Sequence, residues 1–388
     1  MAILFISGLV PSNGQSSSGG NALLGIAEAL CKYANESVEL VSYPQTPSFP
    51  KGKLWIPGYI DKLNDDKEIQ FLPTLNLKIV KSKLWGIHSA RIIRNRAKRH
   101  NGEDLRVLIY NTYHPSVDSI YDACKEVGAK LYAILYDLGV PSKNLGLSRL
   151  TMLGYRMAEK TAEKYIPLLD GRIIINELIA EHYAPNKDYI LVDGGVNKQI
   201  INHLFPLKEK SGDVYTFVLA GLLWEHNGTK LILDAMANYT NTKVRVVFAG
   251  KGVDVSLIET ASHKDPRIKY VGMLNMDALF KLYEEADVLL NLRMEEEVDF
   301  HFPGKLLEYL ATGRYVISTP VAHAERDYGK YMGVLHDKTP EGLIRMMDKV
   351  QQLGKKYLFE TGRNARQFML DNRTWDIQTQ RILQYMSK

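Results

Sequence analysis

A glycine-containing turn that runs into a helical pattern occupies residues 302–313, FPGKLLEYLATG. Backbone N–H groups at a helix N-terminus have no partners within the helix and lie at the positive end of its dipole, so they can bind a diphosphate. Pro303 suits the first turn, Gly304 allows close backbone approach, and Lys305 adds a point charge. Glu308 falls on a neighbouring position of the same face, where a carboxylate would accept hydrogen bonds from a ribose diol. The turn thus predicts a phosphate site, and the alternative is an ordinary capped helix with a solvent-facing lysine and glutamate.

A second glycine-rich segment, residues 12–20 (SNGQSSSGG), follows the first predicted strand. Gly19 and Gly20 permit a tight approach of backbone to ligand, and Asn21 can cap the helix that we expect to begin there. A flexible surface loop is the alternative.

Two further candidates lie where predicted strands end. The strand at 106–111 leads to His114, and the strand at 130–136 leads to Asp137. In a doubly wound sheet both ends lie at the edge where ligands bind. His114 can position or deprotonate a substrate hydroxyl near neutral pH. The alternatives are a loop histidine bonded to backbone and, for Asp137, a helix cap.

Short apolar or β-branched runs alternate with helical patterns along the chain, which predicts parallel α/β structure. A first series of strands spans residues 3–192, a second begins at Tyr215, and the break between them lies near residues 197–213. We therefore expect two doubly wound Rossmann-like domains that face a cleft at the carboxyl ends of their strands. The predicted limits are 1–200 for the first domain, 201–370 for the second, and 371–388 for a C-terminal helix that packs back on the first.

Composition narrows the class of protein. The 388 residues are 45% hydrophobic and 24% charged, a globular profile. No apolar run reaches the ~20 residues of a membrane-spanning helix. The first eight residues lack a basic leader, which predicts a buried strand rather than a signal peptide. Cys31 and Cys124 suggest reduced thiols in a cytoplasmic protein and lack the neighbours that a metal site needs.

The net charge of +5 is unevenly distributed, because eight cations and no acid lie between Lys78 and Arg99. Trp85, Ile87, Ile92 and Ile93 accompany them, so the segment predicts a basic amphipathic helix. Such a helix can contact an anionic membrane or a phosphate-bearing acceptor, and the alternative is a solvated face. We expect no nucleic-acid partner, because no binding motif accompanies the charge.

Taken in order, several motifs resemble the GT-B glycosyltransferases, and within them the large retaining group numbered family four. They are Gly221-Leu222-Leu223, 248–252 (FAGKG), Tyr270-Val271-Gly272, 285–290 (EADVLL) and 302–313, besides the glycine-rich loop. The last motif, preceded by Asn291-Leu292-Arg293, resembles bacterial members that build capsular, exopolysaccharide or O-antigen chains.

The resemblance implies that the second domain binds a nucleotide-sugar donor and the first an acceptor. The helix near Gly304 would receive the diphosphate, and Glu308 would hold the ribose hydroxyls. Loops at Gly250 and Lys251 and at Gly272 to Leu274 would wall the base pocket, and Gly19 and Gly20 would close over the phosphates or acceptor. Asp137 would contact the transferred sugar or the acceptor. Neither metal nor cofactor is implied, and attack on the front face would use the leaving phosphate to deprotonate the acceptor.

The chain also departs from this pattern. Leu222 and Asn227 stand where many relatives carry Arg and Lys that clamp the diphosphate, and Phe300 stands where they carry an acid. Lys230, Lys251, Arg293 and Lys305 are cations that can substitute, and Glu297 is the candidate for the sugar-binding acid.

Three functions remain open at this point. The first is a retaining transferase that moves a sugar from a UDP- or GDP-linked donor to a glycan or lipid-linked glycan, in the cytoplasm or at the inner face of the membrane. The second is a catalytically weak GT-B subunit that supports a partner enzyme. The third is an epimerase of the same fold or a nicotinamide enzyme, and the latter lacks the G-x-G-x-x-G signal after its first strand.

Overall fold

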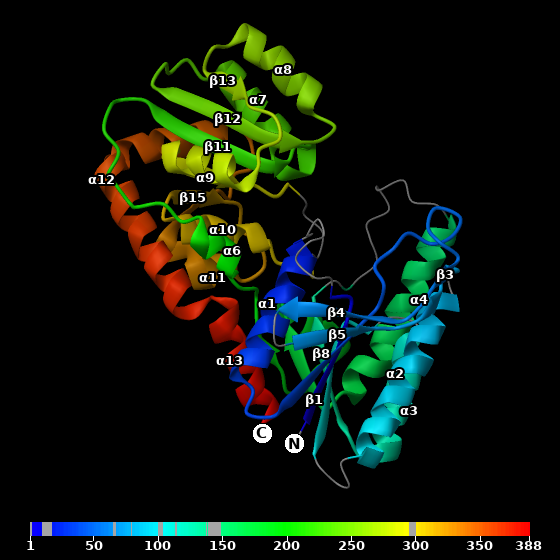
Figure 1. Cartoon of the computed structure of the whole chain (residues 1–388). Coiled ribbons are helices and arrows are strands. Elements are labelled where there is room, and N and C mark those ends of the chain that lie inside the picture. The colour runs from blue at the N-terminus through cyan, green and yellow to red at the C-terminus, as the bar shows by residue number, and fades with distance from the viewer. Residues whose placement is uncertain are drawn as a thin grey trace. The chain divides into compact units, whose positions relative to one another are not determined.

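The computed structural model describes residues 2–9, 18–64, 67–78, 80–99, 104–112, 115–136, 138, 149–294 and 300–388. The chain divides into two units (Figure 1). Unit 1 comprises Met1–Gly195, Phe300–Phe302 and Trp375–Lys388, and unit 2 comprises Val196–Asp299 and Pro303–Thr374. Among the described residues, no helix has both the length and the apolar character that crossing a membrane requires.

Unit 1 is built on an eight-stranded sheet with the order β10-β9-β8-β7-β1-β2-β5-β4, in which β4 runs antiparallel to β5 and the other neighbours are parallel. Its strands are β1 Ala2–Ser7, β2 Ser37–Ser42, β4 Tyr59–Asn64, β5 Lys67–Phe71, β7 Leu105–Tyr110, β8 Lys130–Leu135, β9 Gly171–Ile174 and β10 Ile190–Leu191. A separate pair joins β3 Trp55–Ile56 to β6 Thr74–Leu75. Every residue of β1 and β7 is buried, as expected for parallel strands covered on both faces.

The helices of unit 1 are α1 Ser18–Tyr33, α2 Val80–Arg99, α3 Ser116–Val127, α4 Arg149–Tyr165, α5 Glu177–Tyr183 and α13 Trp375–Met386, with the 3-10 turn η2 Ile166–Leu168. Figure 1 shows α1 and α13 on one face of the sheet and α2 and α3 on the other. The predicted helix start at Asn21 is wrong, because α1 begins at Ser18 and places Gly19 and Gly20 in its first turn. Serine is favoured at helix starts, which accounts for the earlier beginning.

The basic helix predicted between Lys78 and Arg99 is α2, but its apolar side chains do not all face outward. Trp85 is buried, stacks on Tyr43 at 4.7 Å between ring centroids, and donates a hydrogen bond from Nε1 to Thr74. Ile93 is fully buried, since α2 packs along α3. Much of the apolar face of α2 therefore stabilises unit 1 itself.

The C-terminal helix α13 packs on unit 1 mainly through the ring of Trp375. The ring of Trp375 lies so close to Gly25 of α1 that a Cβ there would meet it at 2.4 Å, and Gly195 approaches the same ring. Asp376 accepts hydrogen bonds from Tyr33 and Lys32. The two glycines thus make room for the ring, and the carboxylate fixes the helix against α1.

Unit 2 has a six-stranded parallel sheet with the order β13-β12-β11-β14-β15-β16. Its strands are β11 Tyr215–Leu222, β12 Val244–Lys251, β13 Ile268–Tyr270, β14 Val288–Asn291, β15 Tyr315–Ser318 and β16 Met332–Val334. The order reverses beside β11, which has β12 on one side and β14 on the other. Ligands bind at the carboxyl ends of strands at such a reversal. The predicted fold class, two α/β units with parallel sheets, is confirmed.

The helices of unit 2 are α6 Lys198–Asn202, α7 Thr229–Asn238, α8 Val255–Lys264, α9 Met276–Glu285, α10 Gly304–Thr312, α11 Ala324–Tyr328 and α12 Pro340–Asn372, with 3-10 turns η3 Glu225–Asn227 and η4 Gly329–Tyr331. Gly354 has a φ of 77° and breaks α12 into two helical parts. Beyond the break, α12 packs against α10.

This packing generates the first prediction. A Cβ at Gly362 of α12 would lie 2.1 Å from the carbonyl oxygen of Gly313, which ends α10. Gly362→Ala should therefore lower the free energy of unfolding by about 2 kcal/mol, because backbone must move to admit the methyl group. The midpoint of urea unfolding measures this change.

The matched control is Gly329→Ala, whose Cβ would have its nearest neighbour at an ordinary 3.6 Å. Equal midpoints for both variants would show that α12 does not approach α10 as closely as described.

Candidate functional site

The helix α10 presents its first turn to open space. Pro303 is its N-cap residue, and Gly313 ends it with a φ of 75°. Leu306, Leu307 and Leu310 are buried and hold the helix against the sheet. A Cβ at Gly304 would meet no heavy atom within 4 Å. The space beside Gly304 is therefore open, and a helix N-terminus next to open space suits an anion.

Lys305 turns back from this helix onto the end of β11. Its Nζ donates a hydrogen bond to the carbonyl oxygen of Ala220 at 2.6 Å, and the hydroxyl of Tyr309 donates to the same oxygen at 3.0 Å. Gly221 has a φ of 123°, a backbone conformation that favours glycine, and a Cβ there would lie 1.9 Å from Nζ. The structure thus brings Gly221 and Lys305 together. Tyr309 was not predicted, although its position one helical turn after Lys305 was a signal for it.

Burial dominates the electrostatics of this helix face. It lowers the pKa of the Lys305 ammonium, while Glu308 acts in the opposite direction and Arg293 adds to the lowering. Burial raises the pKa of the Glu308 carboxyl, and Lys305 opposes that shift. A diphosphate bound here would restore the favourable surroundings that the ammonium loses by burial.

Arg293 reaches the same edge from the residues that follow β14. Its backbone N–H donates to Thr319 Oγ1 at 2.8 Å, and its Nη1 donates to Asn227 Oδ1 at 3.2 Å. Asn227 in turn donates from Nδ2 to the carbonyl oxygen of Leu222 at 2.7 Å. Asn227 therefore does not supply a charge after β11, but it holds a guanidinium that β14 supplies. The sequence did not reveal this role.

Two glycines allow close strand packing at the predicted base pocket. Gly250 has a φ of 132° and donates to the carbonyl oxygen of Gly272, whose φ is 72°. A Cβ at Gly250 would meet the carbonyl oxygen of Gly221 at 1.9 Å. Lys251 is exposed opposite Leu222, and Leu274 is half-buried. The predicted loops thus follow neighbouring strands β12 and β13.

Apolar side chains are exposed at this edge. Leu222 is 46% exposed, Val253 79% and Met273 65%, and these residues follow or end β11, β12 and β13 in turn. Exposed apolar side chains next to charged groups are typical of a surface that binds a planar ligand.

The turns after β11 and β12 also hold polar atoms without partners. Among the described residues, Trp224 Nε1, Thr229 Oγ1 and Asp254 Oδ2 are buried and make no hydrogen bond. Buried polar groups in native proteins normally bind water or a ligand. Lys230, also at the start of α7, is exposed and lies 4.0 Å from Glu225, so its charge is shared with a carboxylate.

The three predicted catalytic residues, His114, Asp137 and Glu297, lie outside the described residues. Phe300, which replaces the expected acid, packs within unit 1 against the rings of His182 and Tyr183.

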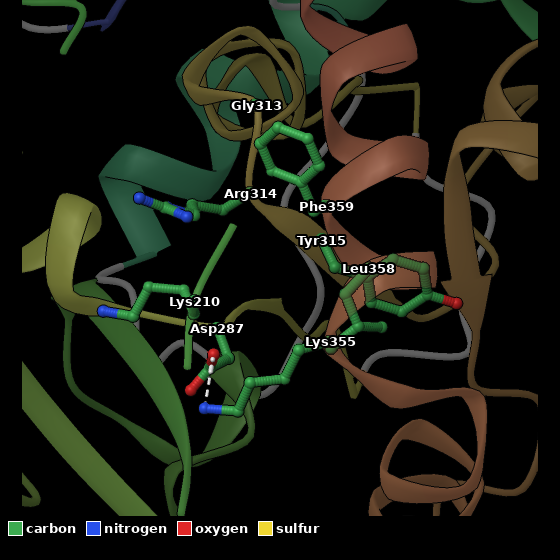
Figure 2. Close-up of a pocket in the computed structure, with 8 residues that line it drawn as sticks. All are labelled: Lys210, Asp287, Gly313, Arg314, Tyr315, Lys355, Leu358 and Phe359. Carbon is green, nitrogen blue, oxygen red and sulfur yellow. Dashed lines mark ion pairs between the residues drawn. The ribbon is translucent and has the colours of Figure 1, made fainter. Parts of the chain in front are cut away.

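A pocket at the opposite edge of the sheet of unit 2, where strands begin, is also rich in charge (Figure 2). Lys355 pairs with Asp287 at 3.2 Å and donates to the carbonyl oxygen of Val214. Lys210 and Arg314 donate to carbonyl oxygens at the end of α9, the negative end of its dipole. These cations have structural partners, so the pocket is a stabilising cluster rather than the predicted donor site.

One family model matches part of unit 2. Residues 214–352 match the family model described as Glycosyl transferases group 1, a range that begins before β11 and ends in α12. A search among curated proteins found no match.

Solved structures resemble the whole chain. Sucrose-phosphate synthase from Thermosynechococcus elongatus is 14% identical, with 100% of this chain and 98% of that chain covered and a TM-score of 0.69. A glycosyltransferase from Rickettsia africae is 14% identical, with 99% and 97% covered and a TM-score of 0.68. Anabaena HepE, in complex with UDP and glucose, is 15% identical, with 100% and 99% covered and a TM-score of 0.61. At such identities the likeness shows the fold. The chain therefore has the GT-B fold of these glycosyltransferases, and its residues 214–352 form a Glycosyl transferases group 1 domain.

Proposed function

We propose that the protein is a retaining glycosyltransferase that moves a sugar from a UDP- or GDP-linked donor to a glycan or lipid-linked glycan in surface polysaccharide synthesis. The observation that carries this proposal is the meeting of Lys305, Arg293 and the open start of α10 beside the reversal of strand order in unit 2. Among the resembling structures, Anabaena HepE is in complex with UDP and glucose, and a protein from E. coli is bound with UDP-2-fluoro glucose. These ligands favour a UDP-sugar among the possible donors.

In this proposal the chain binds the donor diphosphate without a metal or other cofactor. Lys305, Arg293 and the N–H groups of α10 stabilise the charge that develops on the leaving diphosphate, and Glu308 accepts hydrogen bonds from the ribose. Gly221, Gly250, Lys251, Gly272 and Leu274 border the base, and Lys230 adds positive charge nearby. Gly19 and Gly20 of unit 1 contact the phosphates or acceptor.

The transfer breaks the bond between the anomeric carbon and the diphosphate oxygen and forms a bond from that carbon to an acceptor oxygen on the same face. The acceptor proton goes to the leaving diphosphate. Asp137 and His114 would position the sugar and the acceptor hydroxyl, and Glu297 would bind the sugar. The chain therefore contributes mainly positioning and charge stabilisation.

We further propose that the protein acts in the cytoplasm at the inner face of the membrane, with contact through Lys78 to Arg99. A second candidate function, a weakly active subunit that binds nucleotide and supports a partner enzyme, is motivated by Leu222 and Asn227. The hydrogen bond between Asn227 and Arg293 favours the enzyme, because it places a guanidinium beside the loop that lacks one.

Removing either cation should weaken donor binding. Lys305→Ala and Arg293→Ala should each lower the affinity for UDP-glucose at least tenfold, since a charge-assisted hydrogen bond contributes about 1.5–3 kcal/mol. Isothermal titration calorimetry measures this affinity. Lys264→Ala, at the far end of α8, is the matched control and should change nothing.

Asn227→Ala tests whether Asn227 orients Arg293. It should lower the affinity for UDP-glucose about fivefold, which corresponds to the loss of one neutral hydrogen bond. In the Arg293→Ala background, Asn227→Ala should have no further effect on this affinity, because Asn227 acts only through the guanidinium of Arg293. Unchanged affinity in Lys305→Ala, or additive losses in the double variant, would contradict the diphosphate assignment.

The affinity for UDP-glucose should also depend on pH. The protonated ammonium of Lys305 binds the diphosphate, and burial lowers its pKa from 10.5. Affinity should therefore be full at neutral pH and fall as pH rises, at a lower pH than for an ordinary lysine. Lys305→Arg keeps its charge throughout and should remove this dependence. A wild-type affinity that stays constant up to pH 10.5 would contradict the role of Lys305.

Product analysis tests the reaction itself. Incubation with UDP- and GDP-sugars and glycan acceptors should yield a glycoside with the donor's anomeric configuration, seen by NMR, and EDTA should not reduce the rate. Glu308→Gln and Lys305→Ala should lose most of the product. Tight nucleotide binding without turnover on any acceptor would instead indicate the supporting subunit, and inversion or EDTA sensitivity would contradict the proposed mechanism.

A further inference from the structure

An exposed apolar surface of unit 1 lies beside the start of α2. It consists of residues 45–60, 77–78 and 80–83, which we call the tip. Its exposed large apolar side chains are Phe49, Leu54, Trp55, Tyr59, Ile60, Leu77 and Val80. Trp55 lies in β3, which pairs with β6, and Ile60 lies in β4, which pairs with β5. Despite this pairing, the side chain of Trp55 is 55% exposed and that of Ile60 is 65% exposed. Clusters of this kind mark interaction sites, because exposing them to water is unfavourable.

The tip is held open by one buried side chain. Asn76 is fully buried and donates from Nδ2 to the carbonyl oxygens of Pro47 at 2.7 Å and Lys53 at 3.0 Å. Its backbone N–H donates to Leu54, and its carbonyl oxygen accepts from Phe49. These hydrogen bonds, with a fifth from Nδ2 to Thr46 Oγ1 at 3.4 Å, fix the loop in a shape that leaves its apolar side chains outside.

The tip is also tied to the start of α2. Trp85 of that helix donates to Thr74, which belongs to β6 beside β3, and Lys81 donates to the carbonyl oxygen of Thr46 at 3.3 Å. These contacts bring the first lysines of α2 next to the apolar loop.

The charge of the tip has one sign. The tip contains Lys51, Lys53, Lys78, Lys81 and Lys83 and no acidic residue, and the first acid, Asp61, directly follows Ile60. Two such surfaces would repel each other, so the charge disfavours a second copy of this chain as the partner. Aliphatic and aromatic side chains in the same segments as lysines complement an anionic lipid surface, where the rings enter the interface and the ammonium groups remain at the headgroups.

We propose that the tip docks unit 1 on an anionic lipid bilayer, with Trp55 and Ile60 entering the interface and the five lysines binding acidic headgroups. The inference rests on the proposed membrane contact but not on the transfer reaction. It moves the contact from the length of α2 to the tip, because Trp85 and Ile93 of α2 are buried and Arg94 and Arg96 pair with Glu126 and Glu39.

Vesicle binding of the full-length protein tests the proposal. We expect sedimentation with vesicles of phosphatidylcholine and phosphatidylglycerol, and little with phosphatidylcholine alone. The double variant Leu54→Ala/Trp55→Ala should partition at least tenfold less, as expected from the loss of two apolar contacts. Leu168→Ala/Tyr189→Ala, which truncates two exposed apolar side chains of unit 1 outside the tip, is the matched control and should bind like the wild type. Lys51→Gln/Lys53→Gln should lower binding roughly fivefold for each lysine.

Fluorescence supplies a readout that a folding defect would not imitate. Of the four tryptophans, Trp85 and Trp375 are buried and Trp224 is half-buried, so anionic vesicles should shift the emission of Trp55 to shorter wavelength. Trp55→Phe should bind but lose most of that shift.

The outcomes separate the possible errors. If Arg91→Gln/Lys98→Gln/Arg99→Gln loses vesicle binding while the tip variants keep it, α2 is the contact and the tip inference is wrong. If the wild type binds no anionic vesicles, or self-associates through Trp55 instead, the inference is also wrong. Affinity for UDP in the same samples reports on folding and on the donor site, so failure of the donor proposal would be recognised separately.

Discussion

The contact between Lys305 and the carbonyl oxygen of Ala220 is the constraint on which the carboxyl edge of the sheet of unit 2 depends. A buried ammonium is unfavourable unless it makes good hydrogen bonds. Here the ammonium of Lys305 and the hydroxyl of Tyr309 both donate to the carbonyl oxygen of Ala220, near the end of β11. The position of α10 relative to β11 is thereby fixed, beside Gly221, whose φ of 123° favours glycine. The opening at Gly304 follows from the same arrangement, because a helix held at its first turns presents its N-terminus at a defined place.

The two edges of the same sheet use positive charge in opposite ways. Where the strands begin, Lys355 is paired with the carboxylate of Asp287, and Arg314 is bonded to the end of α9 (Figure 2). Where they end, Lys305 and Arg293 donate to a neutral carbonyl and a neutral amide oxygen. A neutral acceptor positions a cation without cancelling its charge. The field at the carboxyl edge therefore remains available to an anionic ligand, with Glu308 as its main counterweight.

The sequence predicted the elements that have a local pattern but not those that depend on contacts between distant segments. The second series of strands begins at Tyr215 as predicted, since an apolar pattern is local. The insertion at 55–75 was missed, because its strands are short and their pairing is set by Asn76 and by contacts with α2. The burial of Trp85 also depends on a distant partner, Tyr43. At the candidate site, local spacing singled out Lys305 and Glu308, and their roles remain a prediction. The bond from Arg293 to Asn227 joins residues that follow two different strands, so it leaves no local pattern.

That bond bears on whether Leu222 and Asn227 weaken the site. The lack of a cation in the loop after β11 matters only if no other residue brings positive charge to the carboxyl edge of the sheet. β14 is the direct neighbour of β11 in that sheet. Because parallel neighbours end side by side, a guanidinium supplied after β14 can occupy the region that a residue after β11 would otherwise reach. Asn227 holds the guanidinium of Arg293 in this region, since its amide donates a hydrogen bond to Leu222 and accepts one from Arg293. The substitution that removes a charge from the loop is thus the one that anchors its replacement.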